Sequence, residues 1–178
     1  MNRAACLFFF GIFALSSPFS LPLVAQAPGP MPEHAKLKNM EGKWNFNLTA
    51  GDGSDASGVA VHKLECDGLW LTSDFACKFG GVPFQGKGLD GYDPDKKKYV
   101  SVWVDSMTPT PMIFEGDYDS TGKVLTMIAK AAGPDKKPAT WRSVSKIINA
   151  DEHTMEMFMT PMGGTETSMM LIAYKRAK

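Results

Sequence analysis

The chain has 178 residues, with 19 Lys and Arg against 19 Asp and Glu, so its formal charge at neutral pH is zero. Such a length suits one domain with a real hydrophobic core, which needs neither a metal nor disulfides for stability. The charge balance implies no basic face for binding nucleic acid and no acidic tail for a basic partner, so no nucleic-acid partner is predicted.

The first 27 residues have the pattern of a secretory signal peptide. Arg3 gives a positive start, residues 4–15 are continuously apolar, and Ala25-Gln26-Ala27 is a small-x-small cleavage site. The apolar stretch is too short to span a bilayer. We therefore expect an exported bacterial protein, periplasmic or secreted, with no membrane span after cleavage.

Beyond the signal peptide, residues 28–35 are predicted to form a linker and residues 36–178 one domain. A short helix is expected from Glu33 to Met40, across that boundary. After Gly42 the helical period disappears, and short segments alternate with turn residues. The predicted strands cover residues 43–50, 58–66, 69–79, 84–92, 98–106, 112–118, 123–131, 139–148, 153–160 and 166–175.

These short sequential strands predict an all-β fold. An up-and-down antiparallel β-barrel of about ten strands is expected, because closing the sheet removes its exposed edges. Residues 86–91, Gly-Lys-Gly-Leu-Asp-Gly, match the G-x-G-x-x-G spacing of dinucleotide-binding loops. That site needs a helix directly after the glycines, and here a turn at residues 92–97 is followed by another strand. The glycines are therefore predicted to lie in the barrel wall, and no cofactor is predicted.

Two cysteines, Cys66 and Cys77, follow the signal peptide. Asp67-Gly68 predicts a hairpin turn, so Cys77 lies eight residues along the returning strand from Leu69. That separation is roughly 25 Å at about 3.3 Å per residue. Since a disulfide needs Cα atoms within about 7 Å, two buried free thiols are predicted.

Cross-strand partners share a face, which predicts the sides of the strands in the second half of the chain. The facing of Trp103 and Asp105 is left open, because the register fails at the Pro109-Thr110-Pro111 loop. Predicted to face the interior are Phe114, Gly116, Tyr118, Leu125, Met127, Ala129, Trp141, Ser143, Ser145, Ile147, Thr154, Glu156 and Phe158. Predicted to face solvent are Ile113, Glu115, Asp117, Thr126, Lys130, Arg142, Val144, Lys146, His153, Met155, Met157 and Met159.

The main functional hypothesis is a binding module for a small apolar or amphipathic molecule. Glu156 is its predicted polar anchor, and burial would raise the pKa of that carboxyl. The other predicted lining residues are Phe75, Met127, Trp141 and Phe158.

Two alternatives stay open. Glu156 would serve as general base of a hydrolase or isomerase-type enzyme, together with Asp105 if that residue faces inward. The stripe Met155, Met157 and Met159 would form a contact patch or supply soft ligands for Cu(I). Same-face residues of a strand lie about 7 Å apart, too far for three to hold one ion without a bend, so no metal site is assigned. His62 is expected to point inward and is a weak candidate for haem ligation.

Gly42-x-Trp44 opens the first strand and Tyr174-x-Arg176 ends the last. Neighbouring first and last strands would place the Arg176 guanidinium over the Trp44 indole and close the barrel. This combination resembles the signature of the calycins, the superfamily of lipocalins and fatty-acid-binding proteins.

A more particular resemblance lies in the centre of the chain. Residues 83–93 (Pro-Phe-x-Gly-x-Gly-x-x-Gly-Tyr-Asp) and 98–105 (Lys-Tyr-Val-Ser-x-Trp-Val-Asp) are similar to the exported bacterial domain-of-unknown-function family DUF1579. The similarity covers roughly residues 36–176. It implies a calycin-like barrel and no particular ligand or reaction.

Overall fold

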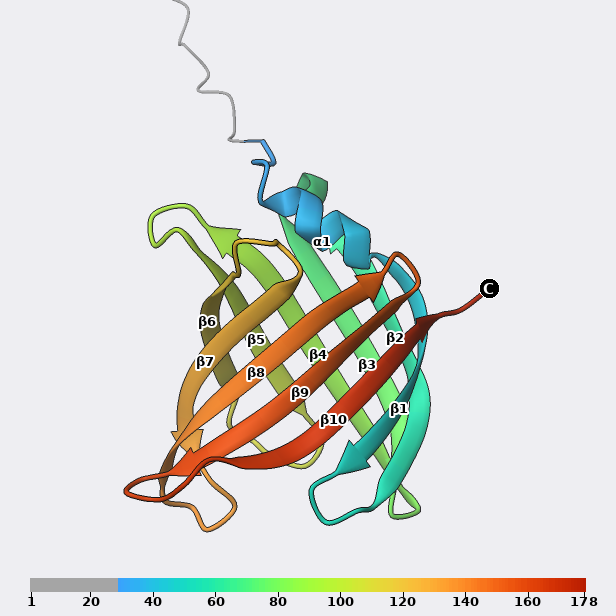
Figure 1. Cartoon of the computed structure of the whole chain (residues 1–178). Coiled ribbons are helices and arrows are strands. Elements are labelled where there is room, and N and C mark those ends of the chain that lie inside the picture. Colours follow the sequence, from blue (N-terminus) through green and yellow to red (C-terminus); the bar gives the residue numbers. More distant parts are fainter. Residues whose placement is uncertain (1–28) are drawn as a thin grey trace, which may run out of the picture.

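The computed structural model describes residues 29–178, so the predicted signal peptide lies outside the described residues. One short helix is followed by ten long strands (Figure 1). The helix is α1 (His34–Met40). The strands are β1 (Gly42–Ala50), β2 (Asp55–Glu65), β3 (Trp70–Phe79), β4 (Val82–Asp93), β5 (Lys98–Asp105), β6 (Met112–Tyr118), β7 (Val124–Ala132), β8 (Pro138–Asn149), β9 (Glu152–Pro161) and β10 (Thr167–Arg176).

The strands form one closed barrel in the order β1-β10-β9-β8-β7-β6-β5-β4-β3-β2. Each strand pairs antiparallel with its neighbours in sequence, and the pairing of β1 with β10 closes the ring. The prediction of an all-β, ten-stranded up-and-down barrel with a short N-terminal helix is confirmed.

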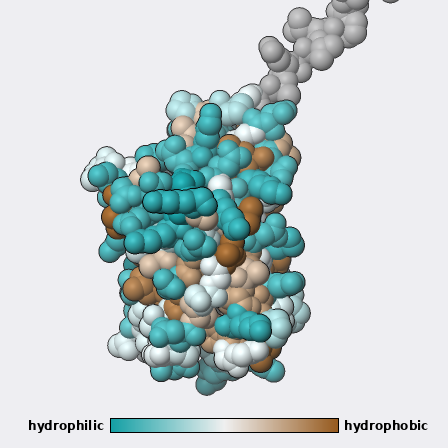
Figure 2. Space-filling model, turned by 90° about the vertical axis from the view of Figure 1, so that its right-hand side faces the viewer, coloured by the Kyte–Doolittle hydropathy of each residue, from teal (hydrophilic) through white to brown (hydrophobic). Residues whose placement is uncertain are grey.

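Strand β1 illustrates why these residues form a barrel wall. Trp44, Phe46 and Leu48 are buried, and the residues between them are exposed. This period of two directs one side of the strand to the interior and the other to solvent. Seen from the side, the half of the surface nearer the helix is mostly hydrophilic, and tan and brown apolar side chains lie among hydrophilic ones in the other half (Figure 2).

Helix α1 lies across one end of the barrel, whereas the other end carries only hairpin turns (Figure 1). Leu37 of the helix is buried among residues of the strands. Hydrogen bonds hold the N-terminal half of the helix on the barrel: the Tyr99 hydroxyl donates to the Glu33 carbonyl at 3.0 Å, and Lys36 Nζ donates to the Gly122 carbonyl at 2.8 Å. No helix of the described part is long and apolar enough to cross a membrane.

The hydrophobic core is divided in two. The β1 cluster comprises the buried residues Trp44, Phe46, Leu48, Ala56, Ala60, Phe75, Ile172 and Tyr174. The helix cluster comprises Leu37, Leu71, Tyr99, Phe114, Met127 and Ala129. Most domains have one contiguous core. In this barrel, the inward-facing positions between the two clusters are occupied by other side chains, which are described below.

A β-bulge near the β8–β9 turn changes the predicted facing of β9. Ile147 pairs with His153 and Asn149 pairs with Glu152, which leaves Ile148 as an extra, exposed residue. A shift of one residue moves every side chain of a strand to its other face. The predicted facing of β9 is therefore wrong: His153, Met155, Met157 and Met159 face the interior, and Thr154, Glu156 and Phe158 face outward.

The glycines of residues 86–91 make room for two indole rings. Gly86 and Gly88 lie on the inward face of β4 beside Trp103 of β5, and a Cβ on Gly86 would overlap the six-membered ring of Trp103. On the outer face, a Cβ on Gly91 would lie 2.5 Å from the ring of Trp70. The same register turns Trp103 inward, which the sequence left open.

Both thiols, Cys66 and Cys77, are free, as predicted. Their predicted burial is wrong: Cys66 is exposed and Cys77 is half-buried. Cys66 opens a one-turn 3-10 helix (Cys66–Gly68) at the helix end of the barrel, where both Cys66 and Asp67 have positive φ. A turn at the surface leaves its side chains in solvent.

Candidate functional site

Polar side chains occupy inward-facing positions between the two apolar clusters. Asp90 of β4 lies opposite Ser101 of β5, and both are half-buried. Three further serines occupy inward positions: Ser73 on β3, and Ser143 and Ser145 on β8. The space between the clusters is therefore lined partly by polar groups.

Asp90 is the most perturbed carboxyl among these residues. Burial raises its pKa to about 6, and a hydrogen bond from the Ser101 hydroxyl offsets part of that rise. Protein surrounds the carboxyl, yet part of the Asp90 surface is accessible to solvent. We call the interior of the closed barrel, bounded by the inward-facing side chains, the lumen.

Two tyrosines converge on Asp90 from other strands. Burial, and then the negative charge of Asp90, raises the pKa of Tyr118 on β6 to about 12. The same two causes, in the same order, raise the pKa of Tyr174 on β10. Asp90, Tyr118 and Tyr174 thus lie within electrostatic reach of one another from three separate strands, and we call them the Asp90 site.

His153 borders the site from β9. Its ring stacks on Tyr174 with centroids 4.3 Å apart and meets Trp44 edge-on at 4.5 Å. Its Nδ1 is buried and has no hydrogen-bond partner among residues 29–178. Burial first, and then the charges of His62 and Arg176, lower the pKa of His153 to about 3, so the imidazole is neutral at physiological pH.

Apolar side chains complete the lumen. Met155 and Met170 pack against the β1 cluster, and Met157 packs against the helix cluster. Trp103 and Trp141 also face inward and are half-buried. Unbranched methionine side chains adapt to apolar surfaces of different shape, so this lining could accommodate an apolar ligand.

Three of the predicted lining residues lie on inward positions, and each is held by packing or hydrogen bonding. Phe75 stacks on Phe46 with centroids 3.9 Å apart. Met127 is buried in the helix cluster. The indole Nε1 of Trp141 donates to the Ala132 carbonyl at 3.3 Å.

The other two predicted residues, Glu156 and Phe158, lie outside the lumen. The Arg142 guanidinium lies 4.1 Å from the Phe158 ring centroid, and the Ser168 hydroxyl donates to Glu156 at 3.0 Å. Glu156 is thus neither an interior anchor nor a general base facing the lumen. The bulge at Ile148 is the physical reason.

Asp105 does face inward, but its oxygens are used by its own loop. Oδ1 accepts hydrogen bonds from the backbone N–H groups of Met107 at 2.8 Å and Thr108 at 3.0 Å, and Oδ2 accepts one from Trp103 Nε1 at 3.0 Å. With Glu156 on the outer face, the two carboxylates do not form an acid–base pair.

The methionine stripe of β9 lies on the inner face, so it is no surface contact patch. His62 faces inward, and its Nδ1 lies 3.1 Å from the Met40 carbonyl. Burial lowers the pKa of His62. Within residues 29–178, no three His, Cys, Asp or Glu side chains are grouped to hold a metal ion.

Asp90 was not among the predicted site residues, although the sequence carries a signal for it. Phe84, Gly86, Gly88 and Asp90 alternate along one strand and therefore share a face. The interior position of Phe84 would have placed the carboxyl inside. The partnership of Asp90 with Tyr118 and Tyr174 depends on the closed barrel and has no local sequence signal.

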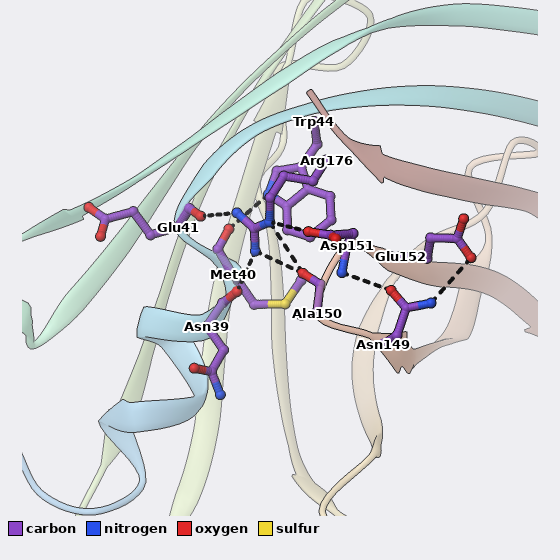
Figure 3. A network of polar contacts seen from close by, with 9 residues as sticks. All are labelled: Asn39, Met40, Glu41, Trp44, Asn149, Ala150, Asp151, Glu152 and Arg176. Atoms are coloured by element: carbon purple, nitrogen blue, oxygen red, sulfur yellow. Dashed lines mark hydrogen bonds and ion pairs between the residues drawn. The ribbon is translucent and has the colours of Figure 1, made fainter. Parts of the chain in front are cut away.

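The rim near α1 is tied together by Arg176 (Figure 3). Its guanidinium lies 4.1 Å from the Trp44 ring centroid. It donates to the carbonyls of Glu41 at 2.7 Å, Asn39 at 3.0 Å and Ala150 at 3.1 Å, and it lies 3.3 Å from the Asp151 carboxylate. Gly42 is required beside it, since a Cβ there would lie 2.7 Å from Arg176 Nη1.

Comparison with solved structures finds similar chains. The chain is similar to the crystal structure of Rv2717c from M. tuberculosis, with a TM-score of 0.59 and 15% identity over 83% of this chain and 99% of that chain. It is also similar to a de novo designed fluorescence-activating β-barrel, with a TM-score of 0.46 and 15% identity over 79% of this chain and 96% of that chain. At 15% identity the likeness to Rv2717c concerns the fold alone, and no argument rests on the likeness to the designed barrel.

A search of curated proteins finds no match to this chain. A family model described as "Protein of unknown function (DUF1579)" matches residues 29–176, which is almost all of the described chain. The chain therefore belongs to the DUF1579 family.

Proposed function

We propose that the lumen binds a small apolar or amphipathic molecule, whose polar part lies against the Asp90 site. The observation that carries this proposal is the divided core, with half-buried inward side chains between its two clusters. In a barrel filled by its own side chains, those residues would be fully buried.

The accessible residues supply both chemistries that such a ligand needs. Trp103, Trp141 and Met157 offer apolar surface, and Asp90 and Ser101 offer hydrogen-bonding groups. Binding sites for small molecules combine a mostly apolar lining with a few polar groups that fix orientation.

The route of entry is the end of the barrel away from α1. Helix α1 covers the other end, where Leu37 is buried and hydrogen bonds to Tyr99 and Gly122 hold the helix in place. The opposite end carries the turns between β1 and β2, β3 and β4, β5 and β6, β7 and β8, and β9 and β10 (Figure 1).

The test is binding of the apolar dye Nile red, measured by fluorescence, with a matched pair of variants. Ser143→Phe adds a ring on an inward position of β8, and Thr140→Phe adds the same ring on an outward position of that strand. We expect Ser143→Phe to weaken binding by roughly tenfold or more, equivalent to about 1.4 kcal/mol, and Thr140→Phe to leave it unchanged. Urea unfolding would verify that both variants fold.

Equal binding to all three proteins, or no binding to the wild type, would overturn the proposal. Native mass spectrometry of the protein purified from its own host would add the mass of any ligand that copurifies.

We also propose that the protein is exported. The pattern of residues 1–27 supports this. The same native spectrum tests it, since an exported chain would have lost the mass of a signal peptide ending near Ala27.

A further inference from the structure

We propose that the lumen selects organic cations, with an alkylammonium head group bound by the Asp90 carboxylate. This inference rests on the proposed binding of an amphipathic molecule in the lumen and names the class of its polar part.

The first argument is the charge inside the barrel. Two carboxylates, Asp90 and Asp105, occupy inward positions of β4 and β5, and Asp105 already accepts three hydrogen bonds. Among the inward strand positions of residues 29–178, positive charge is found only at Arg176, which is bound at the rim. No ion pair within the same residues includes Asp90. Asp90 is therefore an inward-facing carboxylate without an ion-pair partner in the described part of the chain. The helix residue Lys36 lies near Tyr118, but its Nζ donates to the Gly122 carbonyl.

The second argument is what a ligand could add to this carboxylate. A desolvated carboxylate is costly unless a cation or hydrogen-bond donors pair with it. An ammonium group supplies both, since it carries a positive charge and its N–H groups donate. An anionic head group would meet repulsion, and a neutral hydroxyl would supply a hydrogen bond without the charge.

The third argument is the aromatic character of the surroundings. Tyr99 and Tyr118 lie edge to face with centroids 5.0 Å apart, and Tyr92 meets Tyr99 at 5.2 Å. Cations are attracted to the faces of such rings. The protein already uses this contact at the helix end, where Lys36 Nζ lies 5.2 Å from the Tyr118 ring centroid.

The inward-facing tyrosines and histidines around the lumen stay neutral near pH 7. Burial raises the pKa values of Tyr99 on β5, Tyr118 on β6 and Tyr174 on β10. Burial also lowers the pKa values of His62 on β2 and His153 on β9. No neighbouring histidine therefore supplies the positive charge in place of a ligand.

The experiment is isothermal titration calorimetry with three probes of equal chain length: decylammonium, decanol and decanoate. At pH 7.5 we expect the wild type to bind decylammonium roughly tenfold or more tightly than decanol, as a charged hydrogen bond replaces a neutral one. Decanoate should bind most weakly.

Asp90→Asn should remove the preference for decylammonium and leave decanol binding within about twofold. Asp74→Asn is the matched control, because Asp74 lies on the outer face of β3, where it pairs with exposed Lys87. It should bind all three probes as the wild type does.

A pH series gives a second readout. Decylammonium stays charged from pH 5 to 8, whereas Asp90, with a pKa of about 6, becomes protonated at the lower end. The affinity of the wild type for decylammonium should therefore fall by roughly tenfold from pH 7.5 to pH 5, and that of Asp90→Asn should change much less.

The outcomes separate the two proposals. If decanol binds and decylammonium is not preferred, or if Asp90→Asn keeps the preference, the cation inference is overturned and lumen binding stands. If no probe binds to the wild type, and Nile red does not bind either, the proposed function itself is overturned.

Discussion

Asp90 makes the stability of the barrel depend on pH. The pKa of this carboxyl is about 6 in the folded protein, against 3.8 for an unperturbed aspartate. Because the folded state binds the proton more tightly, the stabilisation linked to it is fully present below pH 3.8 and is lost as the pH rises through 6. The loss by pH 7 is about 3 kcal/mol, at roughly 1.4 kcal/mol for each pH unit between the two values.

Asp90→Asn should therefore stabilise the protein near neutrality. We expect its free energy of unfolding in urea to exceed that of the wild type by about 1–3 kcal/mol at pH 7.5, with the gap closing by pH 4. His153 has the opposite dependence: its pKa of about 3 lies below the usual 6.5, so its contribution is present above pH 6.5 and is lost as the pH falls through 3. Comparing variant and wild type at each pH cancels that contribution. A gap that does not change with pH would contradict the prediction.

Gly86 is required by the neighbouring indole. Its backbone does not have a positive φ, so alanine is excluded only by the ring of Trp103. Gly86→Ala should cost about 1–3 kcal/mol of stability, because the indole must move from its place in the wall. Gly133→Ala, where a Cβ would lie 3.3 Å from the exposed Asp135 side chain, is the control and should cost much less.

A double variant identifies the cause of that cost. Combining Gly86→Ala with Trp103→Leu should cost less than the sum of the two single changes, since the smaller side chain leaves room for the added methyl group. Strict additivity in urea unfolding would contradict a steric conflict with Trp103.

At the scale of elements, Arg176 of β10 is bonded to two segments that are far from it in the sequence, the α1–β1 junction and the β8–β9 turn. It bonds the end of α1 through Asn39, the start of β1 through Glu41 and the β8–β9 turn through Ala150 (Figure 3). Lysine carries the same charge but lacks the planar fork of donors that reaches these carbonyls.

Arg176→Lys should thus lower the free energy of unfolding by about 1–3 kcal/mol, because three carbonyls lose hydrogen bonds from a charged donor. Lys175→Ala is the adjacent control. Lys175 forms an exposed ion pair with Glu152 at 3.2 Å, and such pairs contribute about 1 kcal/mol or less. An equal effect of both changes would contradict the role of Arg176 as a tie between segments.

The β8–β9 hairpin shows why the fold was predictable and part of the site was not. Turn residues and strand lengths identify both strands, since Gly, Asn and Asp mark the turns whatever the detailed register. The facing of β9 depends on one extra residue, Ile148, which carries no distinctive signal. Because of this extra residue, Glu156 faces outward and Met157 faces the lumen, which is the reverse of the predicted facing.

At the scale of the whole molecule, the sequence predicts the barrel architecture better than the arrangement of the side chains inside the barrel. Alternation within a strand assigns faces, as it does for Trp44, Phe46 and Leu48 in β1. Relations across the lumen, such as the effect of the Asp90 charge on the pKa values of Tyr118 and Tyr174, arise only when the ring is closed. They join residues that no local pattern relates.

The ring closure has a consequence for how the chain assembles. Nine of the ten strand pairings join neighbours in sequence, and the pairing of β1 with β10 alone spans the domain. Hairpins with short turns form quickly, whereas contacts between distant segments are slow because a long loop must first be ordered. We therefore expect a late intermediate that is an open, curved sheet with its first and last edges free. The seam between β1 and β10 would be its exposed point and the place where a second molecule could pair.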